Sequence, residues 1–179
     1  MVLPRATTDA CCVPYFAARL KKLQTDYGID GFKFDAGEPC FLPRKFETYL
    51  PLQHPSEYTR AYVNNVASRF ELAEVRTGHQ TTGLPGTLTR MGDRFSEWGV
   101  GNGLQSIIPT LLTSGVMGYP FCLPDMIGGN AYFGKFPDRE LLVRWAQANA
   151  LMPAMQFSIA PWVRPKPLSV CYSTQARVS

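Results

Sequence analysis

The segment between Tyr27 and Glu38 carries an ammonium and a carboxylate two positions apart, Lys33 and Asp35. Apolar and polar residues alternate from Gly31 to Asp35, so in a strand the two phenylalanines would point to one face and both charged side chains to the other. An Ala-Gly step follows at once and places Asp35 at the carboxyl end of the strand, where βα proteins keep their chemistry. Asp35 is therefore a candidate nucleophile, with Lys33 keeping it ionised or binding a substrate hydroxyl.

A structural role is the alternative for the same two residues. Asp is a favoured N-cap, so Asp35 could cap a helix or pair with Lys33 at the end of an ordinary strand. The pattern inside this segment fits both interpretations equally well, and the rest of the chain has to separate them.

Polar side chains also end or follow the other segments that read as strands. Short apolar segments at 71–75, 87–91, 119–123 and 152–157 add up, with the Asp35 strand, to as many as five strands separated by helices. This order predicts an α/β barrel with its functional site at one mouth. The polar residues that follow the four further strands are Arg76, Asp93, Asp125 and Gln156.

Helical spacing of apolar residues predicts the elements that position these strands. Helices are expected at 15–27 and 58–70, separated by the Asp35 strand and a proline-rich loop at 39–55. A third is expected at 101–115, kinked at Pro109, and a fourth from Asp138 with Trp145 inward.

The connection between the strands 71–75 and 87–91 is unusual. About eleven residues separate them, too few for an ordinary crossover helix. Either the helix is degenerate here, or one of the two strands is wrongly assigned.

Composition limits the possible classes of function. The chain has 179 residues and a mass of 20.0 kDa, which is short of the roughly 250 residues of a full (β/α)8 barrel. Its 45% hydrophobic and 18% charged residues are typical of a globular chain. A net charge of +4 without basic runs among aromatics does not indicate nucleic-acid binding. No apolar run reaches the roughly 18 residues of a membrane span, and Met1–Ala6 is too short for a signal peptide.

Cysteines and histidines give no indication of a metal site or a cofactor. The five cysteines include no CxxC pair and are interpreted as buried thiols, while His54 and His79 are interpreted as surface or loop residues. A metal-assisted barrel enzyme stays open as an alternative and predicts loss of activity with a chelator. Its ligands would be Asp35, Glu38, Asp93 and Asp125.

Four motifs, taken in their order and spacing, point to one family. They are Tyr27–Glu38, Met91–Trp98 followed by Asn102, Gly118–Asn130 and Leu151–Ser158. Together they resemble family 31 glycoside hydrolases, and within that family the branch of the myogenesis-regulating glycosidase, from about residue 15 to residue 162. The resemblance implies a retaining α-glycosidase on a (β/α)8 barrel, with α-galactosidase activity in this branch.

The resemblance also implies the catalytic roles of two carboxylates. Asp35 corresponds to the nucleophile of the family, which has to be ionised to attack the anomeric carbon. Asp93 corresponds to the acid/base, which protonates the leaving group and later activates water, and which needs an apolar or anionic setting to keep its proton.

Further residues are implied in substrate binding. Arg76 matches an arginine that contacts the sugar, and Lys33 resembles a lysine two positions before the nucleophile of related α-galactosidases. Asp125 lies in a turn on the floor of the family's pocket. Trp98 and Trp162 could offer aromatic faces to the sugar, although burial in a core is the more common role of tryptophan.

Both ends of the chain depart from the family pattern. The first strands of the barrel and a β-rich domain precede Tyr15 in the family, and 163–179 does not match and is expected to be a disordered tail. Residues 1–162 are therefore interpreted as about the C-terminal five strands of a partial barrel, which is expected to be inactive alone because sheet edges and an apolar face stay uncovered. A non-catalytic truncated product that binds sugar or a partner chain is the alternative. For a full-length form, the resemblance suggests the secretory pathway or endoplasmic reticulum.

Overall fold

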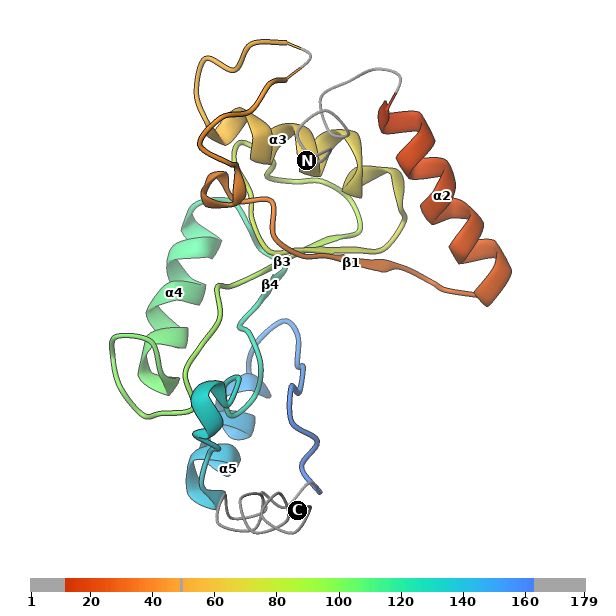
Figure 1. The fold of residues 1–179 in the computed structure, drawn as a ribbon. Helices are drawn as coiled ribbons and strands as arrows, with labels where there is room; N and C mark the ends of the chain where they lie inside the picture. Colours follow the sequence, from red (N-terminus) through yellow and green to blue (C-terminus); the bar gives the residue numbers. More distant parts are fainter. Residues whose placement is uncertain (1–11, 49, 163–179) are drawn as a thin grey trace, which may run out of the picture. The chain divides into compact units, whose positions relative to one another are not determined.

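The computed structural model describes residues 12–48 and 50–162, so the tail predicted at 163–179 lies outside the described residues. The described residues divide into two compact units. The first contains 12–91 and 113–123, and the second contains 92–112 and the residues from 124 onward. The ribbon of Figure 1 follows the chain through both units, and each unit is described by itself below.

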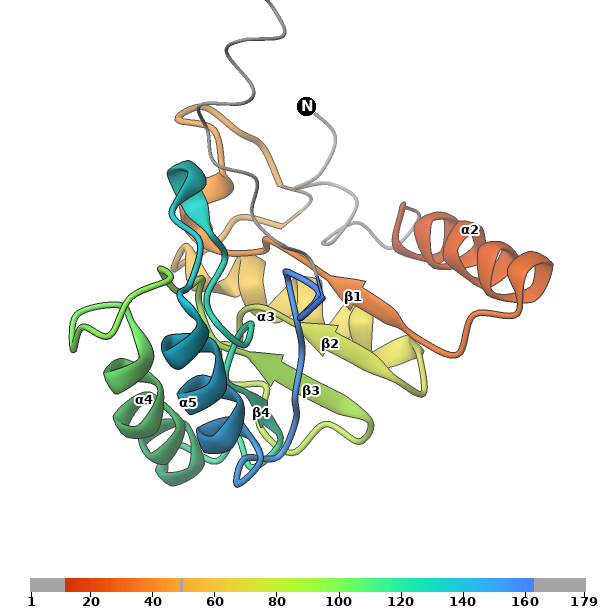
Figure 2. The ribbon, with the colours of Figure 1, turned by 90° about the horizontal axis from the view of Figure 1, so that it is seen from below.

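The first unit contains a parallel sheet of four strands in the order β1-β2-β3-β4 (Figure 2). All four strands were predicted at these positions, and the structure confirms them in a shorter form. Parallel strands in sequence order are the arrangement that an α/β barrel requires. The strands are β1 (Phe32–Phe34), β2 (Ala73–Val75), β3 (Thr87–Arg90) and β4 (Cys122–Leu123).

The fifth predicted strand, 152–157, is wrong, because this segment is irregular in the structure. Pro153 has no N–H group to donate to a ladder. The backbone hydrogen bonds described for the segment are not those of a strand: the Ile127 N–H donates to the Gln156 carbonyl at 2.8 Å, and the Met152 N–H donates to the Asn149 carbonyl of the preceding helix at 3.0 Å. Within the described part of the chain the sheet therefore has four strands rather than five.

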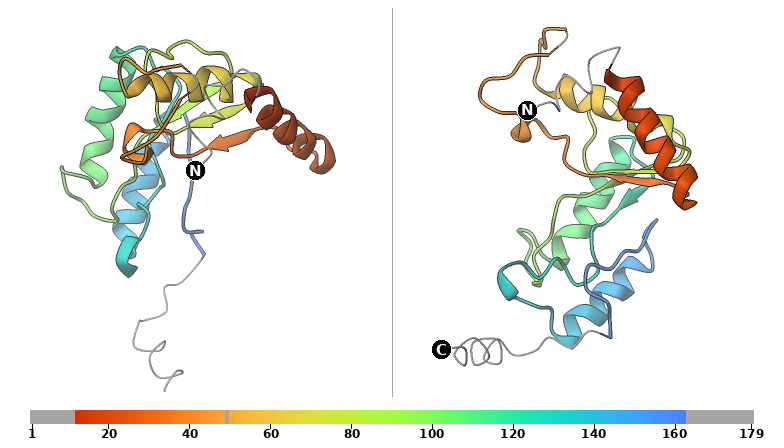
Figure 3. Two further views of the ribbon diagram at one scale, coloured as in Figure 1. Left: turned by 45° about the horizontal axis from the view of Figure 1, so that its top comes forward. Right: turned by 45° about the vertical axis from the view of Figure 1, so that its right-hand side comes forward.

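Helix α3 (Ser56–Asn65) covers one face of this sheet, and α2 (Cys12–Tyr27) lies to the side of it, beyond the start of β1 (Figures 2 and 3). Both predicted helices are thereby confirmed, although α3 ends before Phe70 and a 3₁₀ turn, η2 (Ala67–Arg69), follows it. Their apolar faces meet the sheet residues that point the same way, as the alternation in β1 predicted. Each such side chain, when fully buried, contributes about 1.5–3 kcal/mol. The buried core consists of Phe34, Val63, Val66, Ala67, Phe70, Ala73 and Val75.

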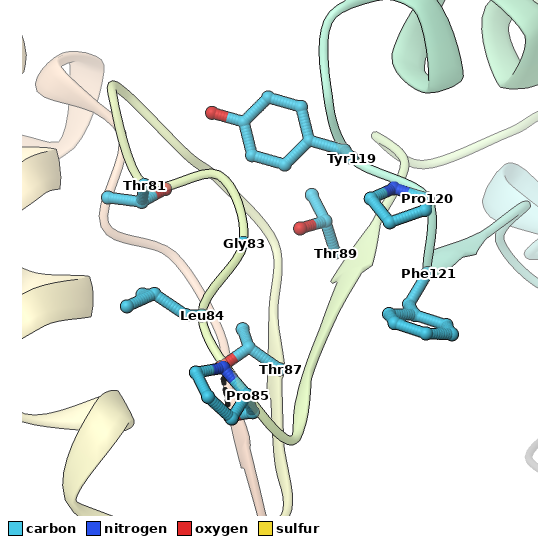
Figure 4. Close-up of a pocket in the computed structure, with 9 residues that line it drawn as sticks. All are labelled: Thr81, Gly83, Leu84, Pro85, Thr87, Thr89, Tyr119, Pro120 and Phe121. Carbon is cyan, nitrogen blue, oxygen red and sulfur yellow. Dashed lines mark hydrogen bonds between the residues drawn. The ribbon is translucent and has the colours of Figure 1, made fainter.

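β2 and β3 pair with each other, so both predicted strands are present. The connection between them contains no helix, as the first of the two interpretations expected. Residues 76–86 return as a loop, and Gly86 with φ of +67° lets the chain pass Glu71. A Cβ atom at Gly86 would lie 1.8 Å from the Glu71 carbonyl oxygen. Because no helix covers β3 here, a cavity of about 110 Å³ opens beside it (Figure 4). Its lining residues are Thr81, Gly83, Leu84, Pro85, Thr87, Thr89, Tyr119, Pro120 and Phe121.

The second unit has its own core, built from the first half of α4 (Leu104–Val116) and from α5 (Arg139–Asn149). Pro109 lies inside α4 as predicted, and the Asp138 side chain caps α5 by accepting the Leu141 N–H at 2.7 Å. Capping by Asp satisfies one of the N–H groups that a helix start leaves unpaired. The core residues are Leu104, Ile107, Ile127, Leu141 and Trp145.

Two short 3₁₀ turns complete the described elements: η1 (Pro39–Phe41) in the proline-rich loop and η3 (Tyr132–Gly134) in the second unit. Of the described helices, none combines the length and the apolar character needed to cross a membrane. The expectation of buried thiols holds for Cys122 and is wrong for Cys40, which is exposed.

Candidate active site

Charged side chains from neighbouring strands lie on the side of the sheet opposite the aromatic core. Glu74 of β2 lies between two cations: its Oε1 is 3.5 Å from Lys33 Nζ and 3.0 Å from Arg90 Nε. Arg90 also reaches Asp35, with Nη2 3.0 Å from Oδ1. The strand order β1-β2-β3 therefore builds a row of alternating charges that ends at the candidate nucleophile.

Asp35 is surrounded by positive charge and still accessible. Its side chain is 60% exposed, and Oδ1 also accepts the Ala36 N–H at 2.9 Å and lies 3.6 Å from Arg76 Nη1. Burial raises the pKa of Asp35, but the Ala36 hydrogen bond and the charges of Arg90, Arg76 and Lys33 outweigh it and hold the pKa below its ordinary value. The carboxylate is thus ionised and reachable by a ligand.

Arg90 is the residue that sequence reasoning missed. Its side chain is only 3% exposed, which is unusual for arginine unless it is paired. Alternation in Thr87–Arg90 was the available signal, because it puts Arg90 on the opposite face to Thr89 and so on the face of Lys33. The expected effect of Lys33 on Asp35 is present, but Arg90 and Arg76 have larger effects.

Arg76 is held in place by a second carboxylate. Its Nε donates to Glu38 Oε1 at 2.7 Å, and its backbone N–H donates to the Phe34 carbonyl at 3.3 Å. The structure therefore brings three of the predicted site residues together in the first unit: Lys33, Asp35 and Arg76.

Helix α3 fixes the backbone that follows Asp35. The Tyr62 hydroxyl donates to the Asp35 carbonyl at 3.0 Å, and Thr59 Oγ1 donates to the Gly37 carbonyl at 2.7 Å. Burial, followed by the neighbouring Tyr58, Asp35 and Glu38, raises the pKa of Tyr62 to about 12, so this hydroxyl keeps its proton. The turn itself is tight: Ala36 has φ of +59° and Gly37 has φ of +96°.

In the second unit, Asp93 has an aromatic partner. The Tyr132 hydroxyl of η3 donates a hydrogen bond to Asp93 Oδ2. The Tyr132 ring also packs edge-on against Phe95, with ring centroids 6.1 Å apart. Sequence patterns did not point to Tyr132, because it lies 39 residues beyond Asp93.

Asp125 is fully buried and holds the loop that carries Asp93. Its Oδ2 accepts the Arg94 N–H and the Asn130 side-chain N–H, both at 2.7 Å. Asp125 itself has φ of +64°, a left-handed conformation that Asp tolerates better than most residues. The arrangement supports a positioning role, and direct contact with a sugar stays a prediction.

The two tryptophans of the predicted site are not core residues. Trp98 is 41% exposed and Trp162 is 82% exposed, so the common core role does not apply to either. Sugar binding by Trp98 and Trp162 stays a prediction. Together with Asp93 and Asp125, Trp98 belongs to the second unit.

The alternative of a metal-assisted reaction lacks a ligand cluster in the described residues. Within 12–48 and 50–162, no three His, Cys, Asp or Glu side chains lie close enough to hold one ion. Of the four ligands considered, Glu38 binds Arg76, and Asp125 binds Arg94 and Asn130. His54 is exposed and His79 partly exposed, as expected of surface residues, but their rings stack at 6.0 Å, which the sequence did not predict.

Comparison with known proteins places the chain among carbohydrate-active enzymes. The model of the Glycosyl hydrolases family 31 TIM-barrel domain matches residues 2–169. Mouse Myogenesis-regulating glycosidase is 49% identical over 156 residues, which cover 83% of this chain and 22% of that protein. The SITS-binding protein of Tetronarce californica is 38% identical over 109 residues, 57% of this chain and 15% of that protein.

A solved structure agrees with the fold. The family 31 sulfoquinovosidase from E. rectale, in complex with the aza-sugar inhibitor IFGSQ, superposes with a TM-score of 0.71 at 23% identity, over 85% of this chain and 24% of the other. The predicted partial TIM-barrel architecture is thereby confirmed. The chain spans about a fifth of the length of these relatives.

Proposed function

The chain belongs to family 31 of the glycosyl hydrolases, and from this premise we propose that Asp35 and Asp93 are the nucleophile and the acid/base of a retaining α-glycosidase. The observation that carries the proposal is the setting of Asp35. Arg90, Arg76 and Lys33 keep its carboxylate ionised, while 60% of the side chain stays exposed to a substrate. A buried structural carboxylate would not combine these two properties.

The contacts of Asp35 also assign its two oxygens. Ala36, Arg90 and Arg76 all approach Oδ1. Oδ2 is therefore the oxygen that we assign to the attack. The contacts of Arg90 and Arg76 with Oδ1 orient the carboxylate, and an oriented nucleophile lowers the entropy lost when the sugar is bound for reaction.

The reaction then follows the two-step course of retaining enzymes. Asp35 Oδ2 attacks the anomeric carbon while the bond to the leaving oxygen breaks, and the proton of Asp93 passes to that oxygen. The resulting glycosyl ester is hydrolysed by a water molecule that gives its proton back to Asp93.

An α-galactoside is the substrate that we propose. The support is the similarity of the four motifs to the branch of the myogenesis-regulating glycosidase, together with the lysine at position 33. Lys33 Nζ is bound to Glu74 at 3.5 Å and its side chain is still 36% exposed, so it can reach a sugar hydroxyl.

The test requires a complete barrel, meaning a longer polypeptide that contains residues 1–179 and has all eight strands. Aryl α-galactoside, aryl α-glucoside and aryl β-galactoside are compared, and the first sugar anomer released is identified by NMR. Turnover of the α-galactoside with the α-anomer released first is the expected result. Release of the β-anomer first would contradict a retaining mechanism. Binding of the sugar without any turnover would favour the non-catalytic alternative.

A further inference from the structure

Tyr132 contacts the proposed acid/base although it lies outside the four family motifs. Its hydroxyl donates to Asp93 Oδ2, across 39 residues of sequence. The Tyr132 side chain is 39% exposed, and it does not belong to the buried core of the second unit. The contact is therefore at the surface, where a carboxyl group that reacts with a substrate has to be.

The turn that carries this tyrosine is fixed to the loop that follows the acid/base. The Asn130 N–H donates to the Arg94 carbonyl at 3.0 Å. One residue later, the Ala131 N–H donates to Ser96 Oγ at 2.9 Å. Two consecutive backbone groups directly before the tyrosine are thus bound to the residues directly after the acid/base.

Close packing of the same two segments orients the tyrosine ring. Gly129 has φ of +74°, and a Cβ atom there would lie 2.7 Å from the Phe95 carbonyl carbon. The Tyr132 ring packs edge-on against the Phe95 ring, with centroids 6.1 Å apart. Ala131 has φ of +49°, a conformation that is costly for a residue other than glycine and persists where the surroundings hold it, commonly at functional sites. The fold itself therefore places the hydroxyl at Asp93.

This hydrogen bond decides which oxygen of Asp93 carries the proton. In a protonated carboxyl group the O–H oxygen is the donor and the other oxygen keeps its full capacity as an acceptor. Because Oδ2 accepts from Tyr132, the proton belongs on Oδ1. In the first step this proton moves from Oδ1 to the leaving oxygen as the glycosidic bond breaks, and in the second step water returns a proton to Oδ1.

The same hydrogen bond changes the energy of the proton transfer. Asp93 is neutral before the transfer and negatively charged after it, and a hydrogen bond to an ionised acceptor is roughly twice as strong as one to a neutral acceptor. The bond from Tyr132 therefore strengthens as the charge develops, and only interactions that strengthen in this way accelerate a reaction. A donor to the ionised form also favours loss of the proton at a lower pH.

We propose that Tyr132 is a positioning residue for the acid/base: it holds Asp93 with Oδ1 towards the leaving oxygen and stabilises the carboxylate that the proton transfer creates. Tyr132 exchanges no proton with the substrate and acts through Asp93. This inference rests on the proposed function, since it concerns the same reaction.

Charged side chains on the elements next to Asp93 could also influence its ionisation. Tyr132→Phe removes one oxygen atom and keeps the ring, so it leaves these side chains in place. A change in the ionisation of Asp93 in this variant therefore reports the lost hydroxyl. The charged residues on these elements are Arg94, Glu97, Asp125 and Lys135.

The test compares Tyr132→Phe with wild type in the complete barrel, on phenyl and dinitrophenyl α-galactosides. The phenyl galactoside needs a proton on its leaving oxygen, and kcat/KM for it is expected to fall about 3- to 30-fold. Dinitrophenolate leaves without a proton, so the second substrate should lose less than about twofold. The basic limb of kcat/KM for the phenyl galactoside should move to higher pH by roughly one unit, because Asp93 has to be protonated for the first step.

Tyr15→Phe is the matched control. It removes the same oxygen atom from a tyrosine of α2 that is 67% exposed, and it should change neither the rates nor the basic limb. Equal losses on both substrates with an unmoved basic limb in Tyr132→Phe would show that Tyr132 only supports the fold. Unchanged rates on both substrates would show that the contact is not used. Either result would overturn the inference.

If wild type hydrolyses neither substrate, the proposed function fails, and the contact is tested through the ionisation of Asp93. Carbon-13 NMR of the aspartate carboxyl groups follows its titration, with the signal assigned from Asp93→Asn. Asp93 should titrate at a higher pH in Tyr132→Phe than in wild type, and Tyr15→Phe should behave as wild type does. Equal titration midpoints in all three proteins would overturn the inference.

Discussion

Arg90 Nη2 lies 3.0 Å from Asp35 Oδ1 although the two residues are 55 positions apart in sequence. Parallel pairing of β1 with β2 and of β2 with β3 creates this contact, because it aligns the ends of all three strands. The same guanidinium is 3.0 Å from Glu74, so one buried cation organises two carboxylates. Asp35 is left ionised and oriented.

Replacing Asp35 by Asn is expected to lower turnover of an aryl α-galactoside by several orders of magnitude in the complete barrel, because an amide cannot form the glycosyl ester. Asp30→Asn is the control, since Asp30 is an exposed carboxylate five positions earlier. Steady-state kinetics measure both variants. A loss below tenfold would remove Asp35 from the nucleophile role.

The pKa of Asp35 predicts how activity depends on pH. The pKa of Asp35 is held below its ordinary value, so Asp35 should stay ionised until the pH falls through this lowered pKa, and the acid limb of kcat/KM should lie at a lower pH than an ordinary aspartic acid would give. Arg76→Met removes one of the stabilising charges and should move this limb to higher pH. Lys33→Met should move the acid limb less, because Lys33 lowers the pKa of Asp35 less than Arg90 and Arg76 do. An unmoved limb in Arg76→Met would contradict the assignment.

The same pKa has a consequence for stability. A carboxyl group whose pKa is lower when folded stabilises the protein above its unfolded-state pKa. This contribution is lost as the pH falls through the folded-state value. Denaturant titrations at several acidic pH values should show Arg76→Met losing less stability on acidification than wild type.

Gly37→Ala is expected to destabilise the turn after Asp35. The new Cβ would lie 2.6 Å from Tyr62 Cδ1, and φ of +96° is unfavourable for alanine. A cost of about 1–3 kcal/mol is expected, with reduced turnover because the Asp35 carbonyl is bound to Tyr62. Gly83→Ala is the control, with φ of +75° and no atom within 4 Å of the new Cβ. Thermal unfolding compares them, and equal midpoints would show that contact with Tyr62 is unimportant.

Asp93→Ala is expected to slow substrates with poor leaving groups far more than activated aryl glycosides, because only the former need a proton on the departing oxygen. Added azide should restore the second step and yield a glycosyl azide. Both effects are measured by kinetics on two galactosides that differ in leaving group. Equal losses without rescue by azide would argue against an acid/base role.

Asp125→Ala is expected to cost about 1–3 kcal/mol for each donor left without an acceptor, here the N–H of Arg94 and the side chain of Asn130. Turnover should fall as well, because Arg94 follows Asp93 directly. Asp138→Ala is the control: it removes the cap of α5 at about 1 kcal/mol and should leave turnover unchanged. If turnover in Asp125→Ala also stays unchanged, Asp125 does not position Asp93.

Local patterns were sufficient for most elements. Periodicity located the helices α2, α3, α4 and α5, and alternation put Phe34 inward and Lys33 on the opposite face. The prediction of a fifth strand at 152–157 was wrong. This segment has the apolar composition of a strand, but it contains Pro153 and does not pair with a neighbouring strand. The short β2–β3 connection was open to two interpretations, and only the pairing of Ala73 with Thr87 decided it.

The sequence by itself determined the family, because four motifs occur in fixed order. It also predicts Asp35 and Asp93 as the reactive residues, the first directly after β1 and the second two residues after Met91. Tertiary structure decided how those residues are held. Glu74 and Tyr132 carry no local signal of their roles, and the alternation in β3 gives only the face of Arg90, since a charge or a hydroxyl acts over a few ångströms and sequence distance does not report spatial distance. Strand register brought Arg90 to Asp35, and the turn after Asp125 brought Tyr132 to Asp93.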